Sequence, residues 1–396
     1  SLNNQDLFIA VNRFTNNSVN DTGFTETVFW QVGLDEGYAG DPLQSVYHEG
    51  LYFNGTDTLF NVCPVRGEPQ ALDSEMYLLG NRLKTEGSDS IYVLYLTGSA
   101  ADVSPPTIEW SLVNMPSEYR QPAPAPQLFN RFLDTNDGRV LGAILYDGKI
   151  HFVSNSLDTF AVKNGVYYGV IDIQNMVGLT STTLLAPPDY DAAYPDLTLE
   201  RYDVGEEIFI SALVSNADDP PGSGVFHFPL GESNLYTFEK LYAGIGGLAL
   251  QFGNTERWGD YTGMVRDFSR PGAVWMAGSY GGGNNQNLTR LFRLSLDGAV
   301  VGREAASSDA AKLNLRPNPA KERLTLDFEL PGAGYYEVDV LDLSGRLVRR
   351  VWADKLKGGV NRYSFNVDAM PSGTYLLDIR SAERGFQMSK KFVVSH

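Results

Sequence analysis

The chain is poor in the residues that most often carry cross-links or catalysis. It has a single cysteine, Cys63, so it cannot form an internal disulfide, and a lone cysteine is usually a small buried hydrophobic residue. It has four histidines, His48, His151, His227 and His396. None of them has the spacing of a Ser-His-Asp triad or of a zinc site, and Gly-x-Ser-x-Gly is absent. The sequence therefore gives little support for nucleophilic or zinc-dependent catalysis.

Long apolar runs and helical patterns are also missing. No stretch of about 18 consecutive apolar residues occurs, so no transmembrane helix is predicted. Apolar residues rarely recur at the helical period, whereas 40 glycines, 21 tyrosines and 21 phenylalanines favour short strands and turns. We therefore predict an all-β protein.

Positive charge is scarce, and the little there is lies unevenly. The net charge of the chain is −17, yet residues 313–396 hold 13 basic and 10 acidic side chains, so the preceding part carries −20. An acidic body repels nucleic-acid phosphates and anionic lipid surfaces. We therefore do not expect the protein to bind nucleic acid. The negative charge fits an extracellular protein or one that gathers divalent cations.

A recurring unit of a short strand, a glycine-containing turn and a second strand runs through the first 300 residues. Four copies can be recognised, at residues 41–53, 140–153, 194–213 and 259–277. Asp-Gly and Pro-Gly turns between β-rich runs are strong hairpin signals. Irregular spacing at about 40–60 residues per unit favours a β-propeller of six or seven blades over residues 1–303. A pair of β-sandwiches is the alternative architecture.

The C-terminal residues 313–396 form a second predicted domain. Tyr336, Val338 and Val340 alternate with acidic residues, the period of a half-buried strand. Short strands with turn signals at intervals of about 8–12 residues predict a small Ig-like β-sandwich. Residues 304–312 are mostly small and polar, so we expect them to be the linker between the two domains.

Four short motifs mark this C-terminal domain. They are Pro317-Asn318-Pro319 at its start, Asp342 with Gly345 and Arg346, Gly373 with Tyr375, and Lys390-Lys391 before the final β-branched residues. In this combination they resemble the C-terminal sorting domain of type IX secretion substrates in Bacteroidota, the Por secretion system. The resemblance covers about a fifth of the chain.

The resemblance implies an address rather than an activity. A chain with such a domain is expected to cross the outer membrane through the type IX translocon, and to end at the cell surface or outside the cell. The expected partners are that translocon and its shuttle and attachment β-barrels, together with surface lipopolysaccharide or further copies of the chain. In the family the sorting domain is usually cleaved.

The first 303 residues resemble a group of uncharacterised secreted propeller-like proteins. The resemblance is carried by residues 134–140, 193–196, 257–263 and 273–280, of which Arg-Trp-Gly-Asp-Tyr at 257–261 is the most specific. This group brings no activity with it, so the resemblance supports the fold alone.

Candidate site residues follow from the propeller prediction. Loops that lead into the innermost strands converge at one end of the central channel, where ligands are expected. Aspartates precede three such strands, and aromatic or basic residues flank them: Asp41, Tyr194, Asp196, Arg257, Trp258, Asp260 and Tyr261. Carboxylates beside aromatic rings suit a cation such as Ca²⁺ or a sugar. The same residue types also cap turns, so a purely structural role is the third interpretation.

Two functions remain open at this stage. The absence of any catalytic constellation favours a non-catalytic binding, adhesion or surface-assembly module. The alternative is a glycan-active or cation-dependent extracellular enzyme, which would require Asp41, Asp196 and Asp260 to meet at one channel mouth, since a glycosidase needs paired carboxylates. No cofactor other than Ca²⁺ is expected.

Overall fold

The protein is described by a computed structural model of the whole chain. The residues that it describes are 1–15, 23–55, 57–68, 72–81, 87–179, 184–202, 205–249, 254–282, 286–295, 301–303, 313–330, 332–342, 347–381 and 386–395. The chain divides into two compact units, residues 1–302 and 303–396. The expected linker at 304–312, and Gly345 and Arg346 of the sorting motif, lie outside the described residues.

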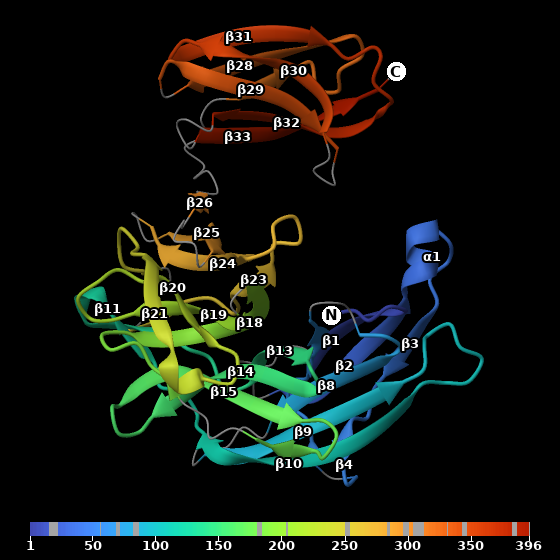
Figure 1. The fold of residues 1–396 in the computed structure, drawn as a ribbon, viewed down its shortest axis with the longest axis vertical. Coiled ribbons are helices and arrows are strands. Elements are labelled where there is room, and N and C mark those ends of the chain that lie inside the picture. The colour runs from blue at the N-terminus through green and yellow to red at the C-terminus, as the bar shows by residue number, and fades with distance from the viewer. Residues whose placement is uncertain are drawn as a thin grey trace. The chain divides into compact units, whose positions relative to one another are not determined.

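The first unit consists of mostly antiparallel sheets whose strands mostly follow one another in chain order (Figure 1). The first sheet contains β1 (Asp6–Phe14), β2 (Phe24–Gly33) and β3 (Ser45–His48). The second contains β6 (Cys63–Pro64), β8 (Glu75–Asn81), β9 (Ser88–Thr97) and β10 (Thr107–Tyr119). The third contains β7 (Arg66–Gly67), β13 (Val140–Tyr146), β14 (Lys149–Asp158), β15 (Lys163–Asp172), β16 (Val177–Gly178) and β17 (Leu184–Leu185). The fourth contains β18 (Asp191–Tyr202), β19 (Gly205–Ser215), β20 (Gly222–Pro229) and β21 (Thr237–Tyr242), and the fifth β23 (Gly263–Arg266), β24 (Ala273–Gly281), β25 (Asn287–Ser295) and β26 (Val301–Arg303).

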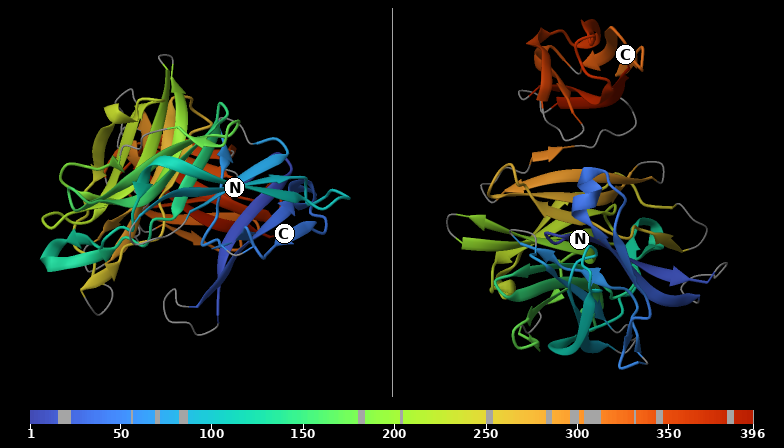
Figure 2. Two further views of the ribbon diagram at one scale, coloured as in Figure 1. Left: turned by 90° about the horizontal axis from the view of Figure 1, so that it is seen from below. Right: turned by 90° about the vertical axis from the view of Figure 1, so that its right-hand side faces the viewer.

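Smaller elements connect these sheets. They are α1 (Leu34–Ala39), the hairpin of β4 (Tyr52–Phe53) and β5 (Asp57–Thr58), the sheet of β11 (Ala125–Gln127), β12 (Arg131–Asp134) and β22 (Thr255–Arg257), and the 3-10 turns η1 (Leu128–Asn130) and η2 (Ser233–Leu235). The blue coil of α1 stands out among the strands in Figure 2. No helix in the described part of the chain has the length and apolar character needed to cross a membrane. The all-β prediction is confirmed.

Three of the four predicted hairpins are present. Strands β13 and β14 pair across Asp147 and Gly148, which both have positive φ, as a tight hairpin turn requires. Strands β18 and β19 pair, and so do β23 and β24. The prediction at residues 41–53 was wrong, because β3 pairs with β2 whereas β4 pairs with β5.

Neighbouring sheets of this unit pack face to face through apolar side chains. Ile144 and Val153 of the third sheet share a core with Leu197 and Ile210 of the fourth. Between sheets, β1 lies beside β6, β6 beside β13, β13 beside β18, and β18 beside β23. In Figure 1 the fourth sheet correspondingly lies between the third and the fifth.

The described residues of the first unit thus hold five principal sheets, together with the smaller three-stranded sheet of β11, β12 and β22.

The second unit is built from two antiparallel sheets. One contains β27 (Asn314–Arg316), β28 (Arg323–Leu330) and β31 (Gly359–Asn366), and the other β30 (Leu347–Leu356), β29 (Gly334–Leu341), β32 (Gly373–Ser381) and β33 (Phe386–Val394). Leu326 and Phe328 from the first sheet and Val338 and Leu377 from the second share one core. The two sheets therefore enclose the apolar residues that the alternating pattern marked.

Asp339 departs from the alternating pattern, since it is buried on the face of β29 expected to be exposed. Its carboxylate accepts hydrogen bonds from Arg350 and Arg380, at 2.9 Å each, and these long side chains cover it. Because β29 is an inner strand of its sheet, arginines from the strands on both sides reach the same position.

Candidate functional site

The first unit contains a hollow of about 850 Å³ with many polar side chains in its lining, which we call the polar hollow. Its walls come from β1, from the segment before β6, from the end of β12 with the loop after it, from β18, and from β22 with the loop that follows. They are formed by Ala10, Val11, Asn12, Phe14, Asn61, Asp134, Asn136, Arg139, Tyr194, Thr255, Glu256, Arg257, Gly259, Asp260 and Tyr261. Four of the predicted site residues meet here: Tyr194, Arg257, Asp260 and Tyr261.

Tyr194 reaches the hollow because β18 is irregular at this point. The register of β18 with β19 shifts between Ala193 and Asp196, and Tyr194 has a φ of 55°, rare for a residue with a side chain. Its hydroxyl donates a hydrogen bond to the backbone oxygen of Asp134 at 2.7 Å. Burial, followed by the charge of nearby Asp134 and Asp260, raises the pKa of this hydroxyl, so it stays protonated and fixed.

Arg257 and Asp260 form an exposed ion pair at the rim. The guanidinium donates to both carboxylate oxygens at 2.5 Å, and these hydrogen bonds raise the pKa of Arg257. Tyr261 beside them is 66% exposed, so its ring is open to a ligand. The loop is anchored by Thr262, whose hydroxyl donates to the backbone oxygen of Tyr194 at 2.6 Å.

The loop after β12, the strand that pairs with β22, carries a second, more buried ion pair. Arg139 donates to the carboxylate of Asp137 at 2.5 and 2.7 Å. The backbone oxygens of Thr135 and Asp137 both accept hydrogen bonds from the side chain of Asn155. The same Asn155 accepts one from the backbone N–H of Tyr194, so one amide holds both walls in place.

Asp196 does not line the hollow, although it lies only two residues from Tyr194. It is 9% exposed and accepts hydrogen bonds from the guanidinium of Arg66 at 2.9 and 3.2 Å. It also accepts one from the backbone N–H of Met264 at 2.8 Å. Asp196 therefore ties β18 to β7 and β23, a structural role.

Asp41 and Trp258 also lie apart from the hollow. Asp41 is exposed just after α1, where its backbone N–H donates to the oxygen of Glu36. Trp258 is fully buried and packs edge-on against Tyr194, with ring centres 6.2 Å apart. The three predicted aspartates Asp41, Asp196 and Asp260 therefore do not line one hollow, because folding engages Asp196 in the core and leaves Asp41 on the surface.

Sequence reasoning missed the walls that come from distant segments. Asn12 on β1 and Asn136 and Arg139 after β12 face the same hollow. The motif at residues 134–140 drew attention to the second segment without indicating what it faces. Among the described residues, no three His, Cys, Asp or Glu side chains gather closely enough to hold a metal ion.

The sorting motifs of the second unit come together at strand β33. The side-chain oxygen of Asn318 accepts a hydrogen bond from the backbone N–H of Val393 at 2.8 Å. Next to it, Ala320 pairs with Val394, and the backbone N–H of Ser395 donates to the oxygen of Ala320. The segment with Pro317 and Pro319 thus holds the last strand of the chain.

All but one of the remaining described motif residues lie on or beside the same strand. Gly373 pairs with Val394, and the ring of Tyr375 packs on Phe392, while its hydroxyl donates to the backbone oxygen of Pro371 at 2.9 Å. Lys390 donates to the backbone oxygen of Leu313 at 2.7 Å, and Lys391 is exposed. Asp342 lies at the end of β29 and is partly exposed.

Comparison with protein families assigns the second unit to a class of export domain. Residues 314–395 match the secretion system C-terminal sorting domain, which confirms the resemblance seen in the motifs. The chain is therefore exported across the outer membrane by the type IX pathway, to the cell surface or the medium. None of the curated proteins matches the chain.

Two solved structures are similar to the chain over most of its length. One is PorZ of Porphyromonas gingivalis, described as an essential surface component of its type IX secretion system. It is 11% identical with a TM-score of 0.25, over 93% of this chain and 63% of PorZ. The chain thus spans less than two thirds of PorZ. The other is a protein of unknown function from Dyadobacter fermentans, 11% identical with a TM-score of 0.38, over 91% of this chain and 98% of that one.

Proposed function

We propose that the chain is a type IX export substrate whose first unit is a non-catalytic binding module for a carbohydrate at the cell surface. The polar hollow is its binding site. Exposed Tyr261 offers a ring face to the apolar side of a sugar, and the amides of Asn12 and Asn136 with the guanidinium of Arg257 offer hydrogen bonds to hydroxyl groups. A volume of about 850 Å³ is in the range of small-molecule sites.

The observation that carries the non-catalytic role is that the carboxylates around the hollow are already engaged. Asp260 is held by Arg257, Asp137 by Arg139, and Glu256 by Arg131 at 2.8 Å, while Asp134 accepts the backbone N–H of Asn136. A glycosidase needs one carboxylic acid with a raised pKa and one free carboxylate across a cleft. A carboxylate that is already paired with an arginine or a backbone N–H holds the walls of a site in place and does not act as an acid or a nucleophile.

The fold and the partners belong to the same proposal. The five principal sheets of the first unit, adjacent along β1, β6, β13, β18 and β23, are blades of a β-propeller. The second unit is an Ig-like sandwich that the translocon and its attachment β-barrels recognise, and residues 304–312 are the linker. Surface lipopolysaccharide or a second copy is then the natural neighbour of the exported chain.

A glycan array with the purified full chain tests this proposal, with lipopolysaccharide of the producing strain included. Tyr261→Ala is expected to weaken binding about two- to tenfold, as loss of an aromatic stacking contact does. Tyr38→Ala, which removes an exposed tyrosine of α1, is the matched control and should bind normally. Release of a cleaved glycan that stops in Asp260→Asn would establish the enzymatic alternative instead.

A further inference from the structure

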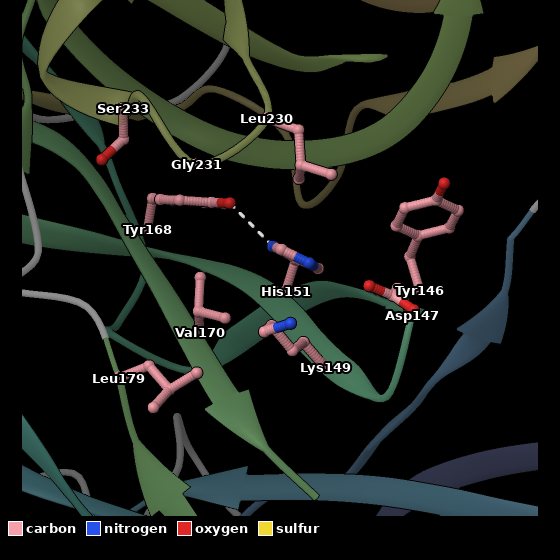
Figure 3. A pocket seen from close by; sticks show the side chains of 10 residues that line it. All are labelled: Tyr146, Asp147, Lys149, His151, Tyr168, Val170, Leu179, Leu230, Gly231 and Ser233. Atoms are coloured by element: carbon pink, nitrogen blue, oxygen red, sulfur yellow. Dashed lines mark hydrogen bonds between the residues drawn. The ribbon is translucent and has the colours of Figure 1, made fainter. Parts of the chain in front are cut away.

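A second, smaller hollow lies between the third and fourth sheets of the first unit. It has a volume of about 230 Å³ and is lined by Tyr146, Asp147, Lys149, His151, Tyr168, Val170, Leu179, Leu230, Gly231 and Ser233. Figure 3 shows His151 and Tyr168 in its middle, with Leu230 and Ser233 on one side and Val170 and Leu179 on the other. We call it the histidine hollow; none of its residues lines the polar hollow.

The histidine hollow combines a buried polar pair, His151 and Tyr168, with three aliphatic side chains. His151 is 4% exposed and Tyr168 2%, and Nδ1 of His151 and the hydroxyl of Tyr168 share a hydrogen bond of 2.7 Å. This bond engages Nδ1 and leaves Nε2 for a ligand (Figure 3). Val170, Leu230 and the partly exposed Leu179 supply the apolar part of the lining, and Tyr146, Asp147, Lys149 and Ser233 complete it.

The walls are held by hydrogen bonds from both sheets. The backbone N–H of Leu179 donates to the oxygen of Val170 at 2.9 Å, and that of Leu230 to the oxygen of Glu206 at 2.8 Å. The hydroxyl of Tyr146 donates to the carboxylate of Glu206 and so bridges the two sheets. The hollow is therefore formed before any ligand arrives, which lowers the entropic cost of binding.

Charge at this site favours an uncharged occupant. His151 is neutral above about pH 4, because burial and then the nearby charge of Lys149 lower its pKa to about 4. Lys149 and Asp147 both line the hollow, and their opposite charges offset one another. A charged ligand would lose part of its hydration against Val170 and Leu230, and whichever of the two charges attracts it, the other repels it.

We propose that the histidine hollow binds a small uncharged ring molecule that carries one hydroxyl or carbonyl group, of the size of a phenol. The ring packs between Val170 and Leu230, and its polar group pairs with Nε2 of His151. An apolar cavity of about 150 Å³ holds benzene, so about 230 Å³ accommodates a substituted ring.

Saturation-transfer NMR on the full chain tests the proposal with three probes, phenol, toluene and benzoate. Phenol should bind at low millimolar concentration and about fivefold more tightly than toluene, the ratio expected for one hydrogen bond. In His151→Phe the preference for phenol over toluene should vanish. In Val170→Phe, where a larger ring fills the space, neither phenol nor toluene should bind. Val177→Phe, an exposed position on β16 outside the hollow, should leave both unchanged.

The comparison of probes on the unmodified chain keeps the test independent of how well the variants fold. Absence of binding for all three probes at about 10 mM would overturn the proposal, as would phenol binding that survives Val170→Phe in a folded variant. Tighter binding of benzoate than of phenol would overturn the assignment to an uncharged ligand. None of these outcomes depends on the polar hollow or on its proposed carbohydrate.

Discussion

The guanidinium of Arg66 donates two hydrogen bonds to the carboxylate of Asp196, although the two residues are 130 positions apart in the chain. The same guanidinium donates to the backbone oxygen of Met264, and Asp196 accepts the backbone N–H of that residue. Three sheets of the first unit, those of β7, β18 and β23, therefore meet at one ion pair.

Removing one partner of this pair is expected to weaken the first unit strongly. Arg66→Ala leaves the carboxylate of Asp196 buried without its counter-ion, which costs about 3 kcal/mol of unfolding free energy. Urea unfolding of the full chain, followed by tryptophan fluorescence, measures this. Arg13→Ala is the control, since its ion pair with Glu26 is half-exposed and contributes less than about 1 kcal/mol. Equal effects of the two changes would contradict the central role of Arg66.

A side chain at Gly142 is expected to disturb the same ion pair between Arg66 and Asp196. A Cβ at this position would lie 2.4 Å from Oδ1 and 3.3 Å from Cα of Asp196. Gly142→Ala should therefore push Asp196 away from Arg66 and lower the unfolding free energy by about 1–3 kcal/mol. Gly263→Ala on the neighbouring β23 is the control, because its Cβ would meet no atom closer than 3.8 Å. A thermal melt that does not distinguish the two variants would count against this packing.

Acid is expected to destabilise the first unit through two histidines. Burial lowers the pKa of His48 and His151 from 6.5 to about 4. Between pH 6.5 and 4 the unfolded chain binds more protons than the folded one, so stability falls as the pH is lowered through this window. From pH 7 to 5, His151 alone should account for about 2 kcal/mol, and the more exposed His48 for less.

Urea midpoints at pH 7 and pH 5 measure this effect. The double variant His48→Gln, His151→Phe should lose much of the pH dependence of the unmodified chain. If the difference between the two pH values is the same in both proteins, carboxylates rather than these histidines set the acid sensitivity.

Cys63 is expected to resist alkylation while the protein is folded. Burial, followed by the charge of Asp196, raises the pKa of its thiol to about 12. At pH 8 only about one thiol in 10,000 is then the reactive thiolate. Mass spectrometry after iodoacetamide treatment should find little modification in buffer and complete modification in urea. Rapid labelling of the folded chain would show that the sheet around β6 opens readily.

Asn318 is expected to support export by holding strand β33. Asn318→Ala removes the acceptor of the Val393 N–H and should loosen the end of β33, at a cost of about 0.5–1.5 kcal/mol to the second unit. In a host with a working type IX pathway, more of the variant should remain inside the cell, as measured by immunoblots of cells and medium. The control is Asn361→Ala, whose amide bonds only the nearby turn at Lys357 and Gly359. Normal export of Asn318→Ala would show that the type IX pathway recognises the sorting domain without the hydrogen bond between Asn318 and Val393.

The sequence by itself determined the β class, most hairpins and the sorting domain. These depend on local chemistry, because alternation marks a half-buried strand and Asp147-Gly148 supplies the positive φ of a tight turn. The sorting motifs, too, could be read one by one. Four of the seven candidate site residues lie on two short segments whose spacing the sequence displays, and these four meet in the polar hollow.

Only the tertiary structure decided which distant residues face one another. Asp196 was a candidate ligand in the sequence, and folding made it the partner of Arg66, whereas Asp41 stayed on the surface. Asn318 and Val393 meet across 75 positions, and His151 and Leu230 line one hollow because two sheets pack face to face. Such contacts arise from the burial of apolar faces between sheets, and no period or spacing within one segment of sequence records which face will meet which.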